Sequence, residues 1–273
     1  MTSAVPEISV IVPTHNRRTL LERKLRALEG EEVAFEVVVV ADACSDDTER
    51  FLARFQPSYP LSWATAPGKH AAYARNQGAR MARGDVVLFS DDDMIPRPGW
   101  LAKNLALHEL PGRVGVSRQV LPPHLGHGAT LSRTAGWWQA PGGSLSMRAD
   151  LFAAVGRYDE SFSGYGGEDA DLGYRLKQAG ADFRFLPDAV VEHWDEHFDA
   201  DLEAKARSAG AAHVRVWRKH ATPEVAWALG VHPLMLGAKR ALLALPLGLL
   251  VGRERYRYEV AYAQGARDAI NGR

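Results

Sequence analysis

The chain has 273 residues, of which 46% are hydrophobic and 24% charged, a composition typical of a globular protein. Lysine plus arginine and aspartate plus glutamate each number 33, so the net charge of zero excludes a bulk electrostatic attraction to nucleic acid. The one cysteine, Cys44, excludes an intrachain disulfide and fits a reducing compartment. The first residues lack the pattern of a signal peptide, so we expect a cytoplasmic protein.

Apolar runs and helical patterns alternate over the first ninety residues, with short connections between them. This βαβαβαβ order predicts an α/β fold with a mainly parallel sheet, helices on both faces and right-handed crossovers. We expect buried strands at 8–12, 35–40, 61–65 and 85–89, and helices at 18–28, after 48 and at 70–82.

Beyond residue 95 the alternation is less regular. Residues 117–133 have little periodicity, and we expect them to form a mobile loop. From about residue 200 onward the pattern is helical. Between these regions we expect strands at 114–116, 142–148, 183–186 and 190–193, and helices at 100–108, 149–155 and from 168.

Three consecutive aspartates, Asp91, Asp92 and Asp93, follow the fourth expected strand. Ligands of open α/β sheets gather where the strands end at their carboxyl edge. Adjacent carboxylates repel one another unless a cation neutralises them, and hard divalent cations prefer oxygen ligands. The triplet therefore indicates a divalent-metal site that holds an anionic, phosphorylated substrate. The alternative is a solvated acidic turn.

Polar residues also lie next to the other expected strands, at ends that converge in this topology. Each has an ordinary structural explanation when it is considered alone, such as capping a turn or forming a surface charge. Their convergence at one edge of the sheet favours a binding site. They are Thr14, His15, Asn16 and Arg17 after the first strand, Asp42, Ser45 and Asp47 after the second, and Lys69, Arg75 and Asn76 before the fourth.

Four segments together resemble the family 2 glycosyltransferases, which have the GT-A fold. They read "ISVIVPTHNR", "VVVVADACSDDT", "ARNQGARMARGDVVLFSDDD" and "GYGGEDADLGYRLKQAG", in the order and at the spacings of that family. The resemblance covers roughly residues 7–195 and implies a Rossmann-like sheet flanked by helices. We expect a GT-A domain over 1–199, with a nucleotide-sugar half over about 1–95 and an acceptor half over about 96–199. Residues 200–273 would form a helical C-terminal extension.

The resemblance also implies which residues contact the nucleotide sugar. Asp42 matches the family aspartate that bonds the base or its ribose, and Lys69 and Arg75 lie where the family contacts base and phosphate. Residues 142–144 lie where the family lets the donor sugar approach the backbone. The implied binding residues are Pro13, Thr14, Asn16, Arg17, Asp42, Lys69, Arg75, Asn76, Asp91, Asp92 and Gly143.

Asp91 and Asp93 match the ends of the family's DxD motif, where Mn²⁺ or Mg²⁺ neutralises a nucleoside diphosphate leaving group. Asp93 is our first choice for direct coordination. Asp91 would hold the ribose or a metal-bound water, and Asp92 would point elsewhere, toward the sugar. In this family a histidine after the last core strand can join the metal, which suggests His193, with His197 as a rival and a structural role as the alternative. An imidazole ligand would favour Mn²⁺.

Glu168 and Asp169 match the family's ED motif and follow a glycine-rich loop at the start of an expected helix. Acids in a first helical turn also complement the helix dipole, which is the structural alternative. The resemblance implies that Asp169 is the general base for the acceptor hydroxyl and that Glu168 orients it or binds the acceptor. We expect Asp171 to lie on the surface or to cap the helix. One base opposite a diphosphate leaving group implies in-line displacement and an inverted product.

Trp137 and Trp138 precede the glycine-rich segment at 142–143. Adjacent tryptophans are usually half core and half surface. One of the two could stack on a sugar ring, so both are candidates for binding the acceptor, together with Glu168.

The C-terminal residues 200–273 lie outside the resemblance. An uncharged apolar run at 241–251 is too short to span a bilayer as a helix. Basic residues on both sides of it fit either a helix packed on the domain or in a homodimer, or a helix lying in a membrane interface. The second alternative would place the protein at the inner face of the membrane.

The sequence therefore predicts an inverting, metal-dependent glycosyltransferase that moves a sugar from a nucleoside diphosphate sugar to an acceptor hydroxyl. UDP is the commonest donor nucleotide in the family and Asp42 is compatible with it, while GDP and dTDP remain open. Two alternatives remain, a sugar nucleotidyltransferase and a non-catalytic nucleotide-sugar binding or scaffold protein. A nucleotidyltransferase begins with a glycine-rich phosphate loop, whereas this chain has "PTHNRR".

Overall fold

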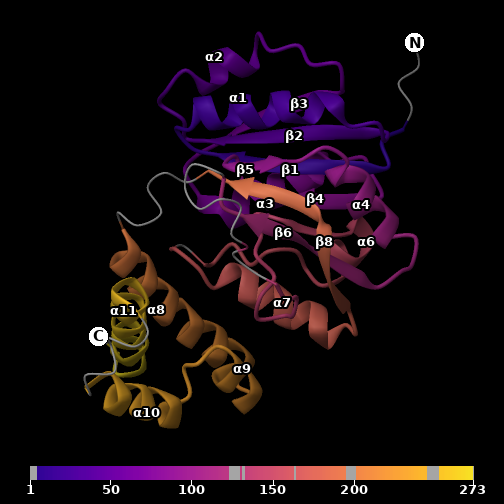
Figure 1. Ribbon diagram of the computed structural model, residues 1–273. Coiled ribbons are helices and arrows are strands. Elements are labelled where there is room, and N and C mark those ends of the chain that lie inside the picture. Colours follow the sequence, from indigo (N-terminus) through magenta and orange to yellow (C-terminus); the bar gives the residue numbers. More distant parts are fainter. Residues whose placement is uncertain are drawn as a thin grey trace.

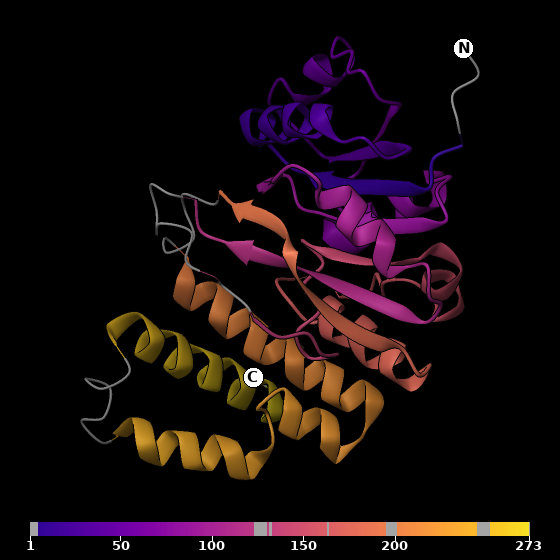
Figure 2. The same ribbon diagram turned by 45° about the vertical axis from the view of Figure 1, so that its right-hand side comes forward.

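The fold is a single curved sheet with helices on both of its faces and a group of helices at one end (Figures 1 and 2). The structure, a computed structural model, describes residues 5–122, 130, 133–162, 164–194, 201–244 and 252–272. The eight strands of the sheet lie in the order β3-β2-β1-β4-β7-β6-β8-β5. The expected α/β class with helices flanking a sheet is confirmed.

The first half of the sheet is parallel, as expected, because each strand is followed by a helix that crosses back over a face. Its central strands are buried on both faces, which explains their uninterrupted apolar runs. The elements are β1 (Ile8–Thr14), α1 (Arg18–Ala27), η1 (Leu28–Gly30), β2 (Phe35–Asp42), α2 (Thr48–Leu52), β3 (Leu61–Ala66), α3 (His70–Met81) and β4 (Val86–Phe89).

The second half of the sheet is mixed. β7 is antiparallel to both β4 and β6, β6 and β8 are parallel, and β5 is antiparallel to β8. The elements are β5 (Met94–Pro96), α4 (Trp100–Leu107), β6 (Arg113–Val120), β7 (Leu145–Arg148), α6 (Ala149–Ala154), α7 (Glu168–Gln178) and β8 (Asp182–His193).

Two expectations for this half were wrong. Residues 117–120 belong to β6 rather than to a loop, and much of the remaining expected loop, 123–129 and 131–132, lies outside the described residues. The two short strands expected at 183–186 and 190–193 are one strand, β8. The sequence pattern is broken because the pairing with β6 shifts register between Ser117 and Arg118.

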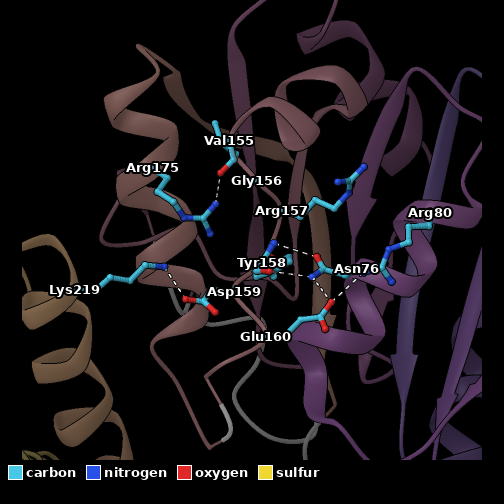
Figure 3. A pocket seen from close by; sticks show the side chains of 10 residues that line it. All are labelled: Asn76, Arg80, Val155, Gly156, Arg157, Tyr158, Asp159, Glu160, Arg175 and Lys219. Carbon is cyan, nitrogen blue, oxygen red and sulfur yellow. Dashed lines mark hydrogen bonds and ion pairs between the residues drawn. The ribbon is translucent and has the colours of Figure 1, made fainter.

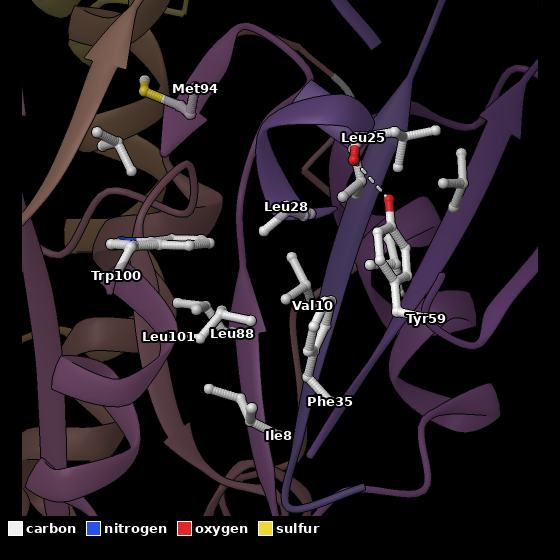
Figure 4. Packing of buried hydrophobic residues seen from close by; sticks show 14 of the residues in the cluster. Ile8, Val10, Leu25, Leu28, Phe35, Tyr59, Leu88, Met94, Trp100 and Leu101 are labelled. Atoms are coloured by element: carbon white, nitrogen blue, oxygen red, sulfur yellow. Dashed lines mark hydrogen bonds between the residues drawn. The ribbon is translucent and has the colours of Figure 1, made fainter. Parts of the chain in front are cut away.

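The largest core cluster fills the space between the sheet and the helices α1 and α4 (Figure 4). Leu25 and Leu28 project from the end of α1 onto β1 and β2, and Trp100 is fully buried beside β4. The Tyr59 hydroxyl lies in this cluster and donates to the Leu25 carbonyl oxygen at 2.7 Å. This packing fixes the first strands, and therefore the loops that leave their carboxyl ends.

The C-terminal region is helical, as expected, and consists of α8 (Leu202–His220), α9 (Pro223–Ala228), α10 (Pro233–Ala244) and α11 (Arg253–Ile270). α8 and α11 lie side by side (Figure 2) with glycines at the contact. A Cβ atom built on Gly210 would lie 2.1 Å from the Tyr262 carbonyl oxygen, so only glycine allows this approach. A second core cluster joins these helices to Trp137, Phe162 and Tyr174.

Among the described residues, no helix has both the length and the apolar character needed to cross a membrane. Residues 245–251, most of the apolar run discussed above, lie outside the described residues.

Candidate functional site

The carboxyl ends of β1, β2 and β4 meet at one edge of the sheet, and most of the expected site residues lie there. The turn Asp91–Asp93 follows β4. Residues 142–144 lie beside this turn, since β7 is antiparallel to β4 and Leu145 pairs with Phe89. The N-terminus of α7 and the end of β8 bring Asp169 and His193 to the same edge.

The three aspartates of the turn point to different partners. Asp92 accepts a hydrogen bond from the Thr14 hydroxyl at 2.7 Å, and Asp93 accepts one from Arg17 Nη1 at 2.5 Å. Both are at least nine-tenths buried, whereas the side chain of Asp91 is 34% exposed. The turn is therefore a built structure held by residues at the end of β1, not a solvated acidic loop.

The pKa values of the two buried aspartates are shifted in opposite directions from the ordinary value. Burial, together with the charge of Asp93, raises the pKa of Asp92 to about 7. Burial acts in the same direction on Asp93, but contacts with His193 and Arg17 outweigh it and lower the pKa of that carboxyl. Asp93 is therefore the more anionic of the pair and the better candidate for a cation ligand.

A fully buried lysine, Lys24, supports the turn from inside the protein. Its Nζ donates to Ser90 Oγ at 2.6 Å and to the Met94 carbonyl oxygen at 2.7 Å, so it joins the two ends of the turn. Burial lowers its pKa to about 8. Sequence reasoning missed this residue. The signal was a lysine on the apolar face that Leu21, Leu25 and Leu28 form on the helix.

Arg75, on α3, connects the aspartate turn to the acidic pair at the start of α7. Its Nη2 donates to Asp91 at 2.8 Å, and its Nη1 lies 3.5 Å from Glu168 and 3.7 Å from Asp169. The guanidinium is buried, and the charge of Asp91 outweighs that burial and raises its pKa. One cation thus holds three carboxylates from two separate motifs.

The backbone of Gly142 and Gly143 closes one side of this cluster. The Gly142 amide donates to Asp169 at 2.9 Å. A Cβ atom at Gly142 would lie 2.6 Å from Asp169 Oδ1, and one at Gly143 would lie 2.7 Å from Asp91 Oδ2. A larger residue at either position would have to displace one of these carboxylates, because the glycine backbone packs directly against them.

Asp169 has the chemistry of a general base. Burial raises its pKa to about 7, with a further rise from Glu168, against the opposing effect of Arg75. Among the described residues, its Oδ1 has no hydrogen-bond donor. This buried carboxylate has an oxygen without a hydrogen-bond donor and a pKa near neutrality, so it can accept a proton from a hydroxyl that reaches it.

The residues at the turn fit a divalent cation in their chemistry. Among the described residues, Asp93 Oδ1 is buried without a hydrogen-bond partner, as expected of an oxygen that would take a cation. His193 Nε2 lies 3.6 Å from the other oxygen of Asp93. No group of three or more histidine, cysteine or acidic side chains in the described ranges is arranged to hold a metal by itself. Ligand oxygens would have to complete the coordination. His197 lies outside the described residues.

Two residues expected to bind the nucleotide, Asp42 and Asn16, also hold loops beside the site. Both oxygens of Asp42 accept amide hydrogen bonds from the start of α3, including 2.7 Å from Gly68 and 2.9 Å from His70. Asn16 Oδ1 accepts from the Ser45 amide at 2.6 Å. Both arrangements shape the loops beside the site. Pro13 is the penultimate residue of β1, and Lys69 is exposed before α3.

Asn76 is not part of the cluster. It is buried, its Nδ2 donates to the Tyr158 carbonyl oxygen at 2.9 Å and to Glu160 at 2.8 Å, and its Oδ1 accepts from the Tyr158 amide at 3.0 Å. Its amide group is thus used to anchor the loop before Glu160 to α3. The expectation that it binds the nucleotide is corrected to a structural role.

The two tryptophans separate as one core and one surface residue. Trp137 is 4% exposed and packs edge-on against Tyr174, so it belongs to the core rather than to an acceptor surface. Trp138 is 52% exposed and remains a candidate for stacking.

Asp171 does not lie on the surface, contrary to expectation. It is fully buried and lies 2.8 Å from Arg175, 2.7 Å from Lys219 and 2.8 Å from His220. The sequence pattern of α7 alone could not show that α8 places Lys219 and His220 next to Asp171. This network joins α7, which carries Asp169, to the C-terminal helices.

Comparison with known families identifies one match. The model for glycosyl transferase family 2 matches residues 9–162. Among curated proteins, the chain is 30% identical to a validoxylamine A glucosyltransferase from Streptomyces hygroscopicus subsp. jinggangensis, over 84% of this chain and 65% of that protein. It is 29% identical to a pre-mycofactocin glycosyltransferase from Mycobacterium tuberculosis, over 68% of this chain and 42% of that protein. The chain thus spans less than two thirds of these relatives.

Solved structures share the fold. A mannosyltransferase from Pyrobaculum calidifontis, in complex with GDP-Man and Mn²⁺, matches with a TM-score of 0.69 at 20% identity, covering 98% of this chain and 88% of that one. TarS 1–349 from S. aureus, in complex with UDP-GlcNAc, matches with a TM-score of 0.57 at 17% identity, covering 98% and 92%.

Proposed function

Because the chain belongs to glycosyl transferase family 2, we propose that it is an inverting glycosyltransferase that moves a sugar from a nucleoside diphosphate sugar to an acceptor hydroxyl. The observation that carries the proposal is the cluster around Arg75. One buried guanidinium contacts Asp91 of the aspartate turn and both Glu168 and Asp169. A leaving-group site and a base are therefore neighbours, as a transfer reaction requires.

Asp169 acts as the general base in this proposal. Its available oxygen takes the proton of the acceptor hydroxyl while that oxygen attacks the anomeric carbon from the face opposite the diphosphate. Single displacement inverts the anomeric configuration. Glu168 lies on the other side of Arg75 Nη1 and helps to fix the guanidinium that orients Asp169.

The aspartate turn holds the diphosphate end of the donor. Asp93 and His193 would bind a divalent cation, with Asp91 contacting it through water or holding the ribose. When bound, such a cation neutralises negative charge on the leaving diphosphate. Oxygen and imidazole ligands suit Mn²⁺, and Mg²⁺ is the alternative. The mannosyltransferase of similar fold in complex with GDP-Man and Mn²⁺ supports a metal-dependent reaction.

We propose UDP as the donor nucleotide, with GDP as the competitor, since related folds carry either UDP-GlcNAc or GDP-Man. In this proposal the nucleotide would contact Pro13 and Thr14 at the end of β1, Arg17 after it, and the exposed Lys69 before α3. The acceptor would approach past Trp138 and Glu168, in the half of the domain after residue 95. The similarity to a validoxylamine A glucosyltransferase supports a small polyhydroxylated acceptor.

Calorimetry with UDP, GDP and dTDP, each with and without Mn²⁺, tests the donor site. We expect one nucleotide to bind, and to bind more tightly with metal, because Asp93 and the diphosphate share the cation. Asp93→Asn should remove the metal effect while leaving metal-free binding intact. If no nucleotide binds more tightly with Mn²⁺, the proposed donor site is wrong.

Asp169→Asn separates the proposed enzyme from a binding protein. The variant keeps the size of the side chain and its hydrogen bond from the Gly142 amide, so we expect nucleotide binding to survive. Sugar transfer should be abolished. A variant that transfers sugar at nearly the normal rate would show that Asp169 is not the base.

A further inference from the structure

A hollow lies away from the aspartate turn, between α3 on one side and α7 and α8 on the other (Figure 3). Its volume is about 520 Å³, and the loop 155–160 forms its floor. Binding sites for small molecules commonly measure about 300–1,000 Å³. The hollow is therefore large enough for a phosphate group together with a small molecule that carries it.

Four cationic side chains surround this hollow from opposite walls. Figure 3 shows Arg175 and Lys219 on one side and Arg80 and Arg157 on the other. They come from three helices, α7, α8 and α3, and from the loop after α6. Guanidinium groups present several N–H donors in a plane that matches phosphate oxygens.

Three carboxylates balance most of this charge. Asp159 and Glu160 line the hollow together with the cations, whereas the buried Asp171 is not part of the lining. Glu160 lies 3.1 Å from Arg80, and Asp159 lies 2.7 Å from Lys219. The fully buried Asp171 is shared between Lys219 at 2.7 Å and Arg175 at 2.8 Å. Four cations against three carboxylates leave one positive charge in excess.

Arg157 carries that excess. No hydrogen bond or ion pair of its side chain is found within the described part of the chain, so its guanidinium is available to a ligand. Its backbone has a φ of 63°, in the left-handed region where a non-glycine residue is strained. Such strain costs roughly 1–3 kcal/mol and is found at functional positions more often than elsewhere.

We propose that this hollow binds a phosphate group, held by Arg157 together with Arg80, Arg175 and Lys219. The site is distinct from the diphosphate end of the donor site and does not depend on the proposed transfer reaction. It adjoins the candidate active site through Tyr158, whose ring lies 5.4 Å from the Arg75 guanidinium carbon. Asn76, which follows Arg75, fixes the same loop.

The test is calorimetry on the full chain with inorganic phosphate, pyrophosphate and glycerol phosphate, in low salt and with EDTA to exclude metal-assisted binding at the aspartate turn. We expect at least one of these anions to bind, and Arg157→Ala to weaken it by about tenfold, as expected for the loss of a charged hydrogen bond. Tighter binding of glycerol phosphate than of inorganic phosphate would assign the hollow to a phosphorylated molecule, and the reverse to the free anion. Either order supports the site.

Two controls make the test specific. Arg54→Ala removes an exposed arginine after α2 and should leave binding unchanged. Arg157→Gly relieves the left-handed strain, so it should be at least as thermally stable as the wild type while binding the anion as weakly as Arg157→Ala. The proposal is overturned if none of the anions binds, or if Arg54→Ala weakens binding as much as Arg157→Ala. It is also overturned if Arg17→Ala abolishes binding while Arg157→Ala does not, because the anion would then occupy the candidate active site.

Discussion

The pH dependence of sugar transfer tests the role of Asp169 most directly. Its pKa is raised to about 7, chiefly by burial. Only the ionised carboxylate can take a proton, so the rate should rise with pH through neutrality. From pH 8 to pH 6 the ionised fraction falls from about 0.91 to about 0.09, and we expect kcat/KM to fall about tenfold over that interval.

The assay is initial-rate transfer across pH 5.5 to 8.5 with saturating metal. Asp92 has a similar pKa and needs a control. Asp92→Asn imitates its protonated form and should keep the same midpoint if Asp169 is responsible. A flat profile between pH 6 and 8, or a midpoint that disappears in Asp92→Asn, would refute the assignment.

Asp92 and Asp169 also affect the stability of the fold, and their contribution to stability falls as the pH rises, whereas the expected transfer rate rises. Because the pKa of each is raised by folding, each favours the folded protein while it is protonated. That contribution is fully present below the pKa of the unfolded chain, near 4, and is lost as the pH rises through about 7. At the pH at which Asp169 is ionised and could act as the base, these two groups therefore stabilise the fold least.

Three further substitutions test the geometry. Gly142→Ala places a Cβ atom 2.6 Å from Asp169 and should reduce kcat about a hundredfold without unfolding the chain. The control is Gly237→Ala, which should have no effect because a Cβ atom there would have nothing within 4 Å. Equal activities of the two variants would contradict the close packing at Gly142. Asp171→Asn removes the buried charge that Arg175 and Lys219 share and should lower the free energy of unfolding by about 1–3 kcal/mol in urea titrations. An unchanged free energy of unfolding would count against a stabilising ionic network. Trp138→Ala should raise the KM for the acceptor about tenfold while the KM for the donor is unchanged, and an effect on the donor alone would remove Trp138 from the acceptor site.

The fold was predictable where the apolar residues of an element follow one uninterrupted pattern. The first four strands are continuous apolar runs that end in turn residues, so their positions and the parallel order followed from local pattern and crossover rules. The sequence predicted two strands in place of β8 because Pro187 and Asp188 interrupt its apolar pattern. In the structure a register shift in the pairing with β6 lets the strand continue past them.

The site was predictable as a set of positions but less so as a set of contacts. The structure brings Asp91, after β4, and Arg75, on α3, into contact at one edge of the sheet, while their roles in binding stay predictions. The roles of Asn76 and Asp171 depend on the loop at 158–160 and on α8, which lie far from them in the sequence. A residue's own neighbours in sequence cannot reveal a partner that only the tertiary fold supplies.

Lys24 gives the aspartate turn an internal cation at pH values below its pKa of about 8. Because its Nζ joins Ser90 to Met94, the shape of the turn is set when the chain folds. A divalent ion that leaves with the nucleotide product would leave behind a turn still shaped for the next one. In the proposed reaction, exchange of metal and nucleotide between turnovers would then need no local refolding of the turn.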